Sequence, residues 1–189
     1  LAETCQDLLQ AKAAIVGCQD AMRAAGRAVP LMVQVTMEST GTMLLGTELA
    51  AALTALEAYD LDAIGLNCAT GPQEMIEHIR FLGRHSRKAI SCLPNAGLPQ
   101  MEGGRAHYRL TPNELAEFHR QFVEEYGVNI VGGCCGTTPA HLKRVVEVVG
   151  RRPPLSRNPE AVPAASSLYQ SVPFVQDKSF LIVGERTNA

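Results

Sequence analysis

The sequence predicts an α/β fold made of the C-terminal half, about four βα units, of a (β/α)8 TIM barrel, followed by a linker and the first strand of a second domain. Short apolar stretches alternate four times with amphipathic helical stretches. The apolar stretches begin near residues 29, 61, 88 and 128, and this spacing is typical of a βα unit. They do not alternate cleanly with polar residues, which indicates parallel strands covered on both faces. Serial units form a doubly wound sheet or a barrel, and four units after a bare helix favour the second half of a barrel.

The expected elements follow one another in the order that this fold requires. Strands are expected at residues 29–36, 61–66, 88–93 and 128–131, after an opening helix at about residues 4–25. The helices that follow the strands are expected in TELAAALTALEAYD, PQEMIEHIRFLGRHS, TPNELAEFHRQFVEEYG and TPAHLKRVVEVVG.

Capping residues support the last two helices. Thr111 and Thr138 each precede a proline, and Glu114 completes a capping box with Thr111. Gly127 and Gly150 stand where a left-handed residue commonly ends a helix. These residues predict where the two helices begin and end.

The chain divides into three parts by composition. Residues 1–150 hold the βα units. Residues 151–173 hold five of the eleven prolines, which predicts an extended linker. Residues 174–189 supply a new strand, FLIVG, and a polar turn, which indicates the truncated beginning of another domain.

Composition and charge exclude several classes of protein. Hydrophobic residues make up 46% of the chain and charged residues 19%, as in ordinary globular domains. The net charge is −2 and the basic residues are scattered, so we expect no nucleic-acid partner. No apolar run approaches the roughly 18 residues that span a membrane, and no export leader precedes the first helix. We therefore expect a cytoplasmic protein without a membrane partner.

Three of the six cysteines fall at strand ends. Cys68 follows a strand in GLNCATGP, and Cys134 and Cys135 follow another in VGGCCGTTP. The carboxyl ends of parallel strands meet at one edge of a sheet, where functional residues gather, so these thiols can lie close together. Zinc binds thiolates and prefers four ligands, so three protein ligands leave one position open, as in catalytic sites.

The remaining cysteines and the histidines have simpler interpretations. A strand-end cysteine is commonly a small buried hydrophobic residue, and this alternative stays open for each thiol. Cys92 lies inside an apolar run and is interpreted as core, and Cys5 and Cys18 as core or surface residues of the opening helix. The five histidines show no ligand spacing.

Residues around the thiols are candidates for substrate contacts. Gly133, preceded by Gly132, allows the backbone to approach a ligand closely. The helix that begins after Cys135 would favour thiolates or the carboxylate of an amino-acid substrate at its N-terminus. Glu38 and Asn95 follow strands at the same edge, where they are either substrate contacts or ordinary polar loop residues.

Three segments in order, GLNCATGP, SCLPNAGLP and VGGCCGTTPAHL, closely resemble the homocysteine S-methyltransferase domain. The resemblance covers most of residues 1–150. It implies a (β/α)8 barrel that binds one Zn2+ through Cys68, Cys134 and Cys135, with the thiol of homocysteine as the fourth ligand. It implies methyl transfer to that thiol, which forms methionine.

The tail FLIVGERTNA resembles the opening of the pterin-binding domain in cobalamin-dependent methionine synthases. This resemblance implies methylcobalamin as methyl donor, recharged from 5-methyltetrahydrofolate, with the folate and cobalamin modules in the same full-length chain. Glu185 and Asn188 match the folate-site motif. The alternatives are a corrinoid-independent homocysteine methyltransferase, which uses betaine or S-methylmethionine, and a zinc-binding module without catalysis. Four units leave two strand edges exposed, so we expect the isolated chain to bind zinc weakly or not at all and to be inactive.

Overall fold

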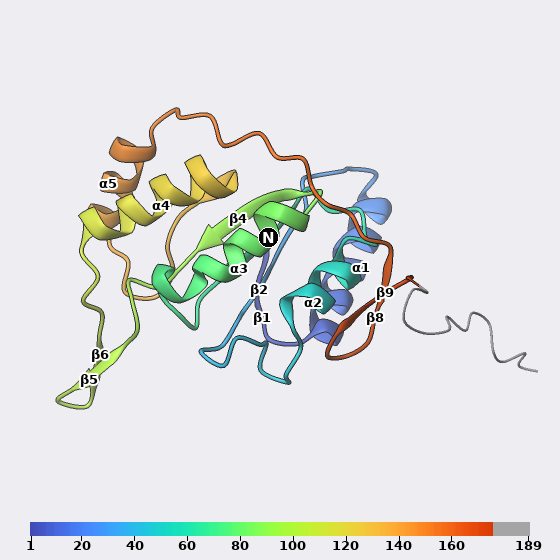
Figure 1. Ribbon diagram of the computed structural model, residues 1–189, viewed down its shortest axis with the longest axis horizontal. Helices are drawn as coiled ribbons and strands as arrows, with labels where there is room; N and C mark the ends of the chain where they lie inside the picture. The colour runs from blue at the N-terminus through green and yellow to red at the C-terminus, as the bar shows by residue number, and fades with distance from the viewer. Residues whose placement is uncertain (176–189) are drawn as a thin grey trace, which may run out of the picture.

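The computed structural model of the chain describes residues 1–175 and shows a five-stranded parallel sheet flanked by helices (Figure 1). The strands of this sheet are β1 (Ala2–Cys5), β2 (Met32–Val35), β3 (Ala63–Asn67), β4 (Ala89–Leu93) and β7 (Ile130–Val131). The helices are α1 (Leu8–Ala25), α2 (Leu49–Leu56), α3 (Pro72–His85), α4 (Pro112–Tyr126) and α5 (Pro139–Val149).

The strand order identifies the kind of parallel sheet. It runs β1-β2-β3-β4-β7, so each strand pairs in parallel with the strand of this sheet that precedes it in the chain. A doubly wound sheet reverses direction at a switch point, and this sheet does not. Crossovers between parallel strands are right-handed, so an order without reversal places the connecting helices on one face. The fold is therefore an α/β fold compatible with part of a TIM barrel.

The prediction that the chain starts with a bare helix was wrong, because a short strand precedes that helix. β1 has only four residues and includes Glu3 and Thr4, so it forms no apolar run that a sequence pattern could reveal. Helix α1 begins at Leu8, where the side chain of Asp7 accepts a hydrogen bond from Gln10 N at 2.8 Å. The described residues thus contain five βα units rather than four.

The predicted caps are confirmed at α4 and partly at α5. Thr111 and Glu114 form the expected capping box, and Gly127 ends α4 in the left-handed conformation, with φ 69° and ψ 34°. At Thr138 the helix-start partner is the side chain of His141, which accepts a hydrogen bond from Thr138 N. Gly150 has a positive φ of 54°, but its ψ of −129° lies outside the left-handed helical region.

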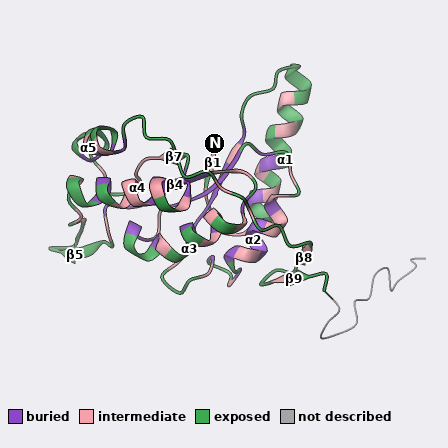
Figure 2. Ribbon diagram, turned by 45° about the horizontal axis from the view of Figure 1, so that its top comes forward, coloured by how far each residue is buried: buried purple, intermediate pink, exposed green. Residues whose placement is uncertain are grey.

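The two faces of the sheet carry different side chains. The outer face packs apolar residues against the helices and is buried with them (Figure 2). These residues are Val33, Val35, Ile64, Leu66, Ile90 and Cys92. The inner face carries polar side chains near its centre, where Gln34 Nε2 on β2 donates to Ser91 Oγ on β4 at 3.0 Å, across Gly65 of β3. Cys92 is confirmed as a core residue, whereas Cys5 is buried at the end of β1 and Cys18 is exposed on α1.

Two hairpins add to the predicted elements. β5 (Gln100–Glu102) and β6 (Arg105–His107) pair in the loop between β4 and α4 and project from the body of the chain (Figure 1). β8 (Ala164–Ser166) and β9 (Ser171–Pro173) pair within the predicted linker and contact α2.

The linker is fastened to the helical layer before it reaches this second hairpin. The Arg157 guanidinium donates to the carbonyls of Ser86 and Lys88, each at 2.7 Å, and Leu155 N donates to Val123 O at 2.9 Å. The predicted strand FLIVG lies outside the described residues.

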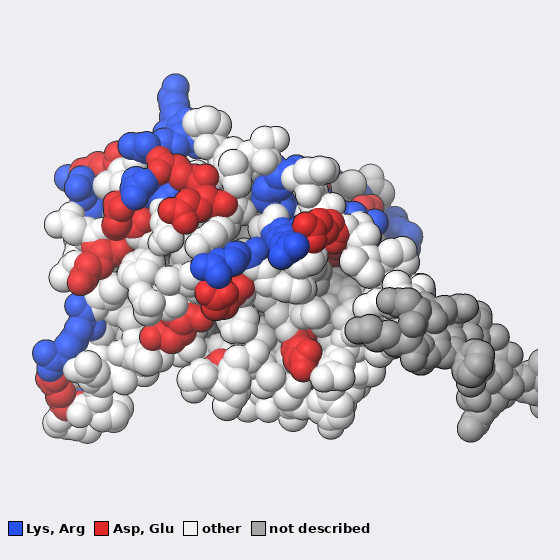
Figure 3. Space-filling view, in the orientation of Figure 1, with Lys and Arg blue, Asp and Glu red and all other residues white. Residues whose placement is uncertain are grey.

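The surface carries charges of both signs. On the face shown in Figure 3, basic and acidic side chains are interspersed, and several form ion pairs along the helices. Within residues 1–175, no helix has the length and apolarity that crossing a membrane requires.

Gly65 permits the close approach of β3 and β4, and we predict that Gly65→Ala destabilises the fold. A Cβ at this position would overlap with Ser91 Oγ and the Ser91 carbonyl. Overpacking of this kind costs about 1–3 kcal/mol of the free energy of unfolding, which urea denaturation followed by circular dichroism measures. Gly17→Ala is the matched control, because Gly17 lies exposed in α1 with open space around it, and we expect a gain of about 0.5–1 kcal/mol there. Equal stability of Gly65→Ala and the parent protein would contradict the packing argument.

Candidate metal centre

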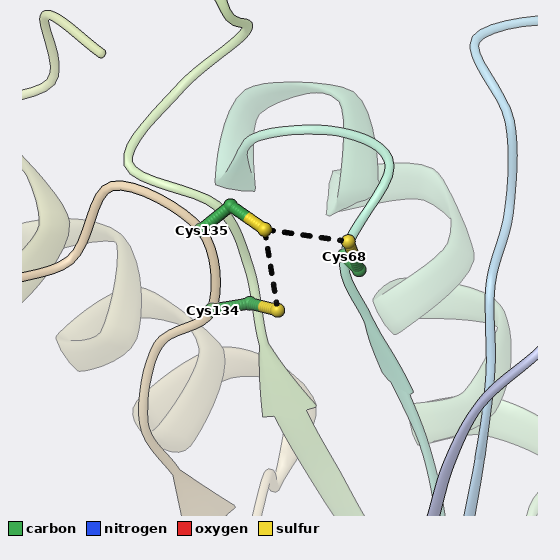
Figure 4. A group of neighbouring side chains, drawn as sticks. All are labelled: Cys68, Cys134 and Cys135. Atoms are coloured by element: carbon green, nitrogen blue, oxygen red, sulfur yellow. Dashed lines mark hydrogen bonds between the residues drawn. The ribbon is translucent and has the colours of Figure 1, made fainter. Parts of the chain in front are cut away.

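The three predicted thiols converge at the carboxyl edge of the sheet. Cys68 follows β3, and Cys134 and Cys135 lie in the loop between β7 and α5. Cys135 Sγ lies 3.8 Å from Cys68 Sγ and 4.0 Å from Cys134 Sγ, and all three sulfurs lie within 4.8 Å of one another. Figure 4 shows the sulfurs turned toward a common point. Tetrahedral ligands at about 2.3 Å from a zinc ion are about 3.8 Å apart, so the spacing fits three corners of a zinc tetrahedron.

The end of β4 supplies the hydrogen bonds that place these cysteines. Cys68 N donates to the carbonyl of Leu93 at 3.2 Å, and Cys134 N donates to the carbonyl of Pro94 at 2.8 Å. Cys135 N donates to the side-chain Oδ1 of Asn95 at 3.1 Å. Three consecutive residues therefore fix the backbone of the three cysteines, because β4 lies between β3 and β7 in the sheet.

The backbone at Cys68 is strained. Cys68 and Ala69 adopt φ values of 61° and 58°, in the left-handed region that favours glycine. Such conformations cost on the order of 1–3 kcal/mol each and persist where the surroundings impose them, often at functional sites. Here Thr70 N donates to the Cys68 carbonyl at 2.7 Å, which closes the tight turn that carries the thiol.

Two glycines let the loop before Cys134 pack tightly. A Cβ at Gly133 would overlap with the Thr137 side chain, and one at Gly132 would lie 3.1 Å from Leu93 Cγ. Thr137 Oγ1 in turn donates to the Cys134 carbonyl at 2.7 Å. Gly133 thus has a packing role in the loop, and its contact with a substrate stays a prediction.

Two buried asparagines support the cluster. Asn95 is 3% exposed and holds Cys135, as described above. Asn67, the last residue of β3, is fully buried, and its Nδ2 donates to Thr4 Oγ1 at 2.7 Å and lies 3.9 Å from Cys134 Sγ. Asn95 was predicted as a candidate substrate contact, whereas Asn67 was not predicted, although a polar residue directly before Cys68 at the end of an apolar strand was a usable signal.

Glu38 lies beyond β2, the strand beside β3, at the same edge. It is half-buried, and its backbone N–H donates to the Thr42 carbonyl at 2.8 Å within the loop. The metal-ligating group found in residues 1–175 consists of the three cysteines without Glu38. The predicted folate residues Glu185 and Asn188 lie outside the described residues.

Two histidines hold the loops that surround the thiols. His119 Nε2–H donates to the Gly132 carbonyl at 2.7 Å, and His141 Nε2–H donates to the Leu110 carbonyl at 2.8 Å. Burial lowers the pKa of His119 to about 4, and its enclosed Nδ1 has no partner in the described structure that would accept a hydrogen bond if this nitrogen were protonated. The neutral imidazole is therefore the form that fits the fold.

Electrostatics oppose ionisation of the metal-free cluster. Burial, followed by the neighbouring Cys68 and Cys135, raises the pKa of Cys134 to about 11. The Cys134 thiol is therefore protonated at neutral pH until a cation offsets the repulsion. Metal binding at such a site releases protons, so its affinity falls as the pH falls.

Tyr108 is a neighbour of the cluster that the sequence analysis missed. It follows β6, and its ring lies against Gly136, where a Cβ would be 2.5 Å from the Tyr108 Cβ. Burial raises the pKa of its phenol, and the adjacent Cys135 side chain raises it further. No local sequence pattern marks this contact, because the hairpin that carries Tyr108 was not predicted.

A parallel βα sheet with three convergent thiols at its carboxyl edge defines an α/β protein that is compatible with part of a TIM barrel and has a candidate metal-thiolate site. The family model for homocysteine S-methyltransferase matches residues 1–149. The chain therefore belongs to the homocysteine S-methyltransferase family.

Two curated relatives extend this comparison. The chain is 55% identical over 189 residues to methionine synthase of Mycobacterium tuberculosis (strain ATCC 25618 / H37Rv) and 53% identical over 194 residues to methionine synthase of Mycobacterium leprae (strain TN). Each match covers 100% of the chain but 16% of the relative. The chain thus spans about a sixth of the length of these relatives.

The buried neutral His119 predicts a loss of stability in acid. Its pKa is lower in the folded state than in the unfolded state, so the unfolded chain binds a proton first as the pH falls. Between about pH 7 and pH 5, we expect the metal-free protein to lose about 2 kcal/mol of unfolding free energy through this group, as measured by urea denaturation. His119→Gln removes the titrating ring and should flatten this dependence.

His107→Gln serves as the matched control, because His107 is exposed on β6. It should leave the pH dependence unchanged. If the unfolding free energy of His119→Gln depends on pH in the same way as that of the parent protein, His119 is not the group responsible for the loss of stability in acid.

Proposed function

We propose that the chain forms part of a zinc-dependent enzyme that transfers a methyl group to the thiol of homocysteine and so forms methionine. The observation that carries this proposal is the convergence of Cys68, Cys134 and Cys135 with the sulfur spacing of a tetrahedral zinc site. Family membership and the names of the relatives support the substrate and the product.

Cys68, Cys134 and Cys135 would hold the metal as thiolates. Three protein ligands leave one tetrahedral position, which suits the sulfur of the substrate. Bound zinc supplies one piece of chemistry, which is to deprotonate a coordinated thiol and so generate a nucleophile at neutral pH. The protein holds the backbone of the three cysteines through hydrogen bonds to Leu93, Pro94 and Asn95.

The surrounding residues would position the cluster and the substrate. Asn95 and Asn67 restrain Cys135 and Cys134 from within the protein, which limits the movement of the sulfurs. We retain Glu38, Asn95 and Gly133 as candidate substrate contacts. The N-terminus of α5 lies beyond Cys135, and its helix dipole favours the negative charge of thiolates or a carboxylate.

The donor belongs to other parts of a longer enzyme. We propose methylcobalamin, which supplies an electrophilic methyl group and is recharged from 5-methyltetrahydrofolate. The share of the relatives that the chain covers supports a larger modular protein. In it, residues 1–150 would belong to the homocysteine domain, residues 151–173 to a linker and residues 174–189 to the start of the pterin-binding domain, with Glu185 and Asn188 at the folate site. Reduced thiols at the metal site also favour a cytoplasmic location.

We predict that the full-length enzyme binds one zinc ion at this site and that each of the three cysteines is required. Cys68→Ser and Cys134→Ser should each lower the zinc content by about one ion per chain and abolish methionine formation, because two thiolates and a hydroxyl hold zinc poorly. Zinc is measured by mass spectrometry and methionine by chromatography. Cys18→Ser is the matched control, since Cys18 is exposed on α1. Unchanged zinc content in Cys68→Ser would exclude the three-cysteine site.

The donor is tested separately with the parent enzyme. Methyl transfer from free methylcobalamin to homocysteine, without transfer from betaine or S-methylmethionine, is the expected result. Turnover with betaine or S-methylmethionine alone would support the corrinoid-independent alternative. Zinc binding without turnover from any of the three donors would support a non-catalytic module.

A further inference from the structure

Cys135 differs from the other two cysteines in its exposure. It is exposed, whereas Cys68 and Cys134 are half-buried. When four sulfurs share a metal and an electrophilic methyl group arrives from outside, the most exposed protein thiolate competes directly with the substrate. The site therefore needs a means of making Cys135 less reactive than the substrate sulfur.

Tyr108 is placed to act on Cys135. Its ring lies on Gly136, the residue after Cys135, and Gly136 has a φ of 78° and no side chain to displace the ring. Burial raises the pKa of its phenol, and among the three cysteines Cys135 raises it most. The ring of Tyr108 thus lies against the loop that presents the most exposed thiol.

The two residues that follow Tyr108 are held by contacts to other segments. Leu110 N donates to the Ala96 carbonyl at 3.1 Å, and the Leu110 carbonyl accepts from His141 at 2.8 Å. Arg109 pairs with Glu102 across the β5–β6 hairpin. These contacts hold Tyr108 against the loop of Cys135 although the hairpin itself projects outward.

We propose that the Tyr108 hydroxyl donates a hydrogen bond to the metal-bound sulfur of Cys135 and thereby protects this thiolate from alkylation, so that the methyl group reaches the substrate sulfur. This inference rests on the proposed zinc site. A hydrogen bond to a thiolate withdraws electron density from the sulfur and lowers its nucleophilicity, while the sulfur stays on the metal. Tyr108 is thus a positioning residue that acts through Cys135.

The test uses the zinc-loaded full-length enzyme with excess zinc and limiting iodoacetamide. In the probe reaction a thiolate sulfur forms a bond to the methylene carbon, and iodide leaves with the bonding electron pair. Peptide mass spectrometry then gives the rate of modification at each cysteine. Tyr108→Phe keeps the ring on Gly136 and removes only the hydroxyl. We expect it to raise the rate at Cys135 by about tenfold, a typical effect of a lost outer-shell partner.

Two further variants complete the design. Tyr126→Phe makes the same change at the far end of α4, where the ring lies near Arg80, and should leave the rate at Cys135 unchanged. Gly136→Ala retains the hydroxyl but displaces the ring, and should also raise the rate. In the cobalt-substituted enzyme, Tyr108→Phe should shift the sulfur-to-metal charge-transfer band to lower energy, because Cys135 becomes more electron-rich.

The outcomes separate this inference from the proposed function. The role of Tyr108 would be overturned if the parent enzyme binds zinc but Tyr108→Phe has the same rate of Cys135 modification and the same cobalt spectrum as the parent. This result would leave the metal site intact. A parent enzyme without zinc would overturn the proposed site and the inference with it. Faster modification confined to Cys68 or Cys134 in Tyr108→Phe would also contradict the assignment to Cys135.

Discussion

Three sulfur atoms lie within 4.8 Å of one another at the edge of this sheet. They repel one another once ionised, and the rest of the site depends on how the structure holds them together. Burial, followed by the neighbouring Cys68 and Cys135, raises the pKa of Cys134 and so opposes its ionisation. A divalent cation would offset both effects, because it attracts each thiolate. The protein contributes rigidity through the hydrogen bonds that place the three cysteines.

That rigidity comes from one place in the sheet. Leu93 at the end of β4 and the next two residues, Pro94 and Asn95, each accept a hydrogen bond from the backbone of one of the three cysteines. β4 can do so only because the parallel order places it between β3 and β7. The close approach of β3 and β4 at Gly65 and the strained turn at Cys68 are local costs of this arrangement. Topology thus determines which backbone groups are available to fix the site.

Sequence patterns were sufficient for features that depend on neighbouring residues. Helix caps such as Thr111 and the strand-end positions of the thiols follow from local propensity and periodicity, and the structure places them as predicted. β1 was not predicted because it is short and partly polar. The two hairpins were not predicted because pairing across a turn leaves little apolar pattern in the sequence. Asn67 and Tyr108 were missed because their partners lie far away in the chain. Contacts of this kind become visible only when the fold is known.

A fall in pH weakens both metal binding at the thiols and the folding of the structure around them. Protonation of the thiolates removes the ligands of a bound metal, and protonation of His119 places a charge in a buried position beside the carbonyl of Gly132. The charged ring would keep its hydrogen bond to the Gly132 carbonyl, so the cost of protonation comes from burial of the ring, whose Nδ1 has no partner in the described structure. The site is therefore best formed where His119 is neutral and a metal holds the thiolates ionised.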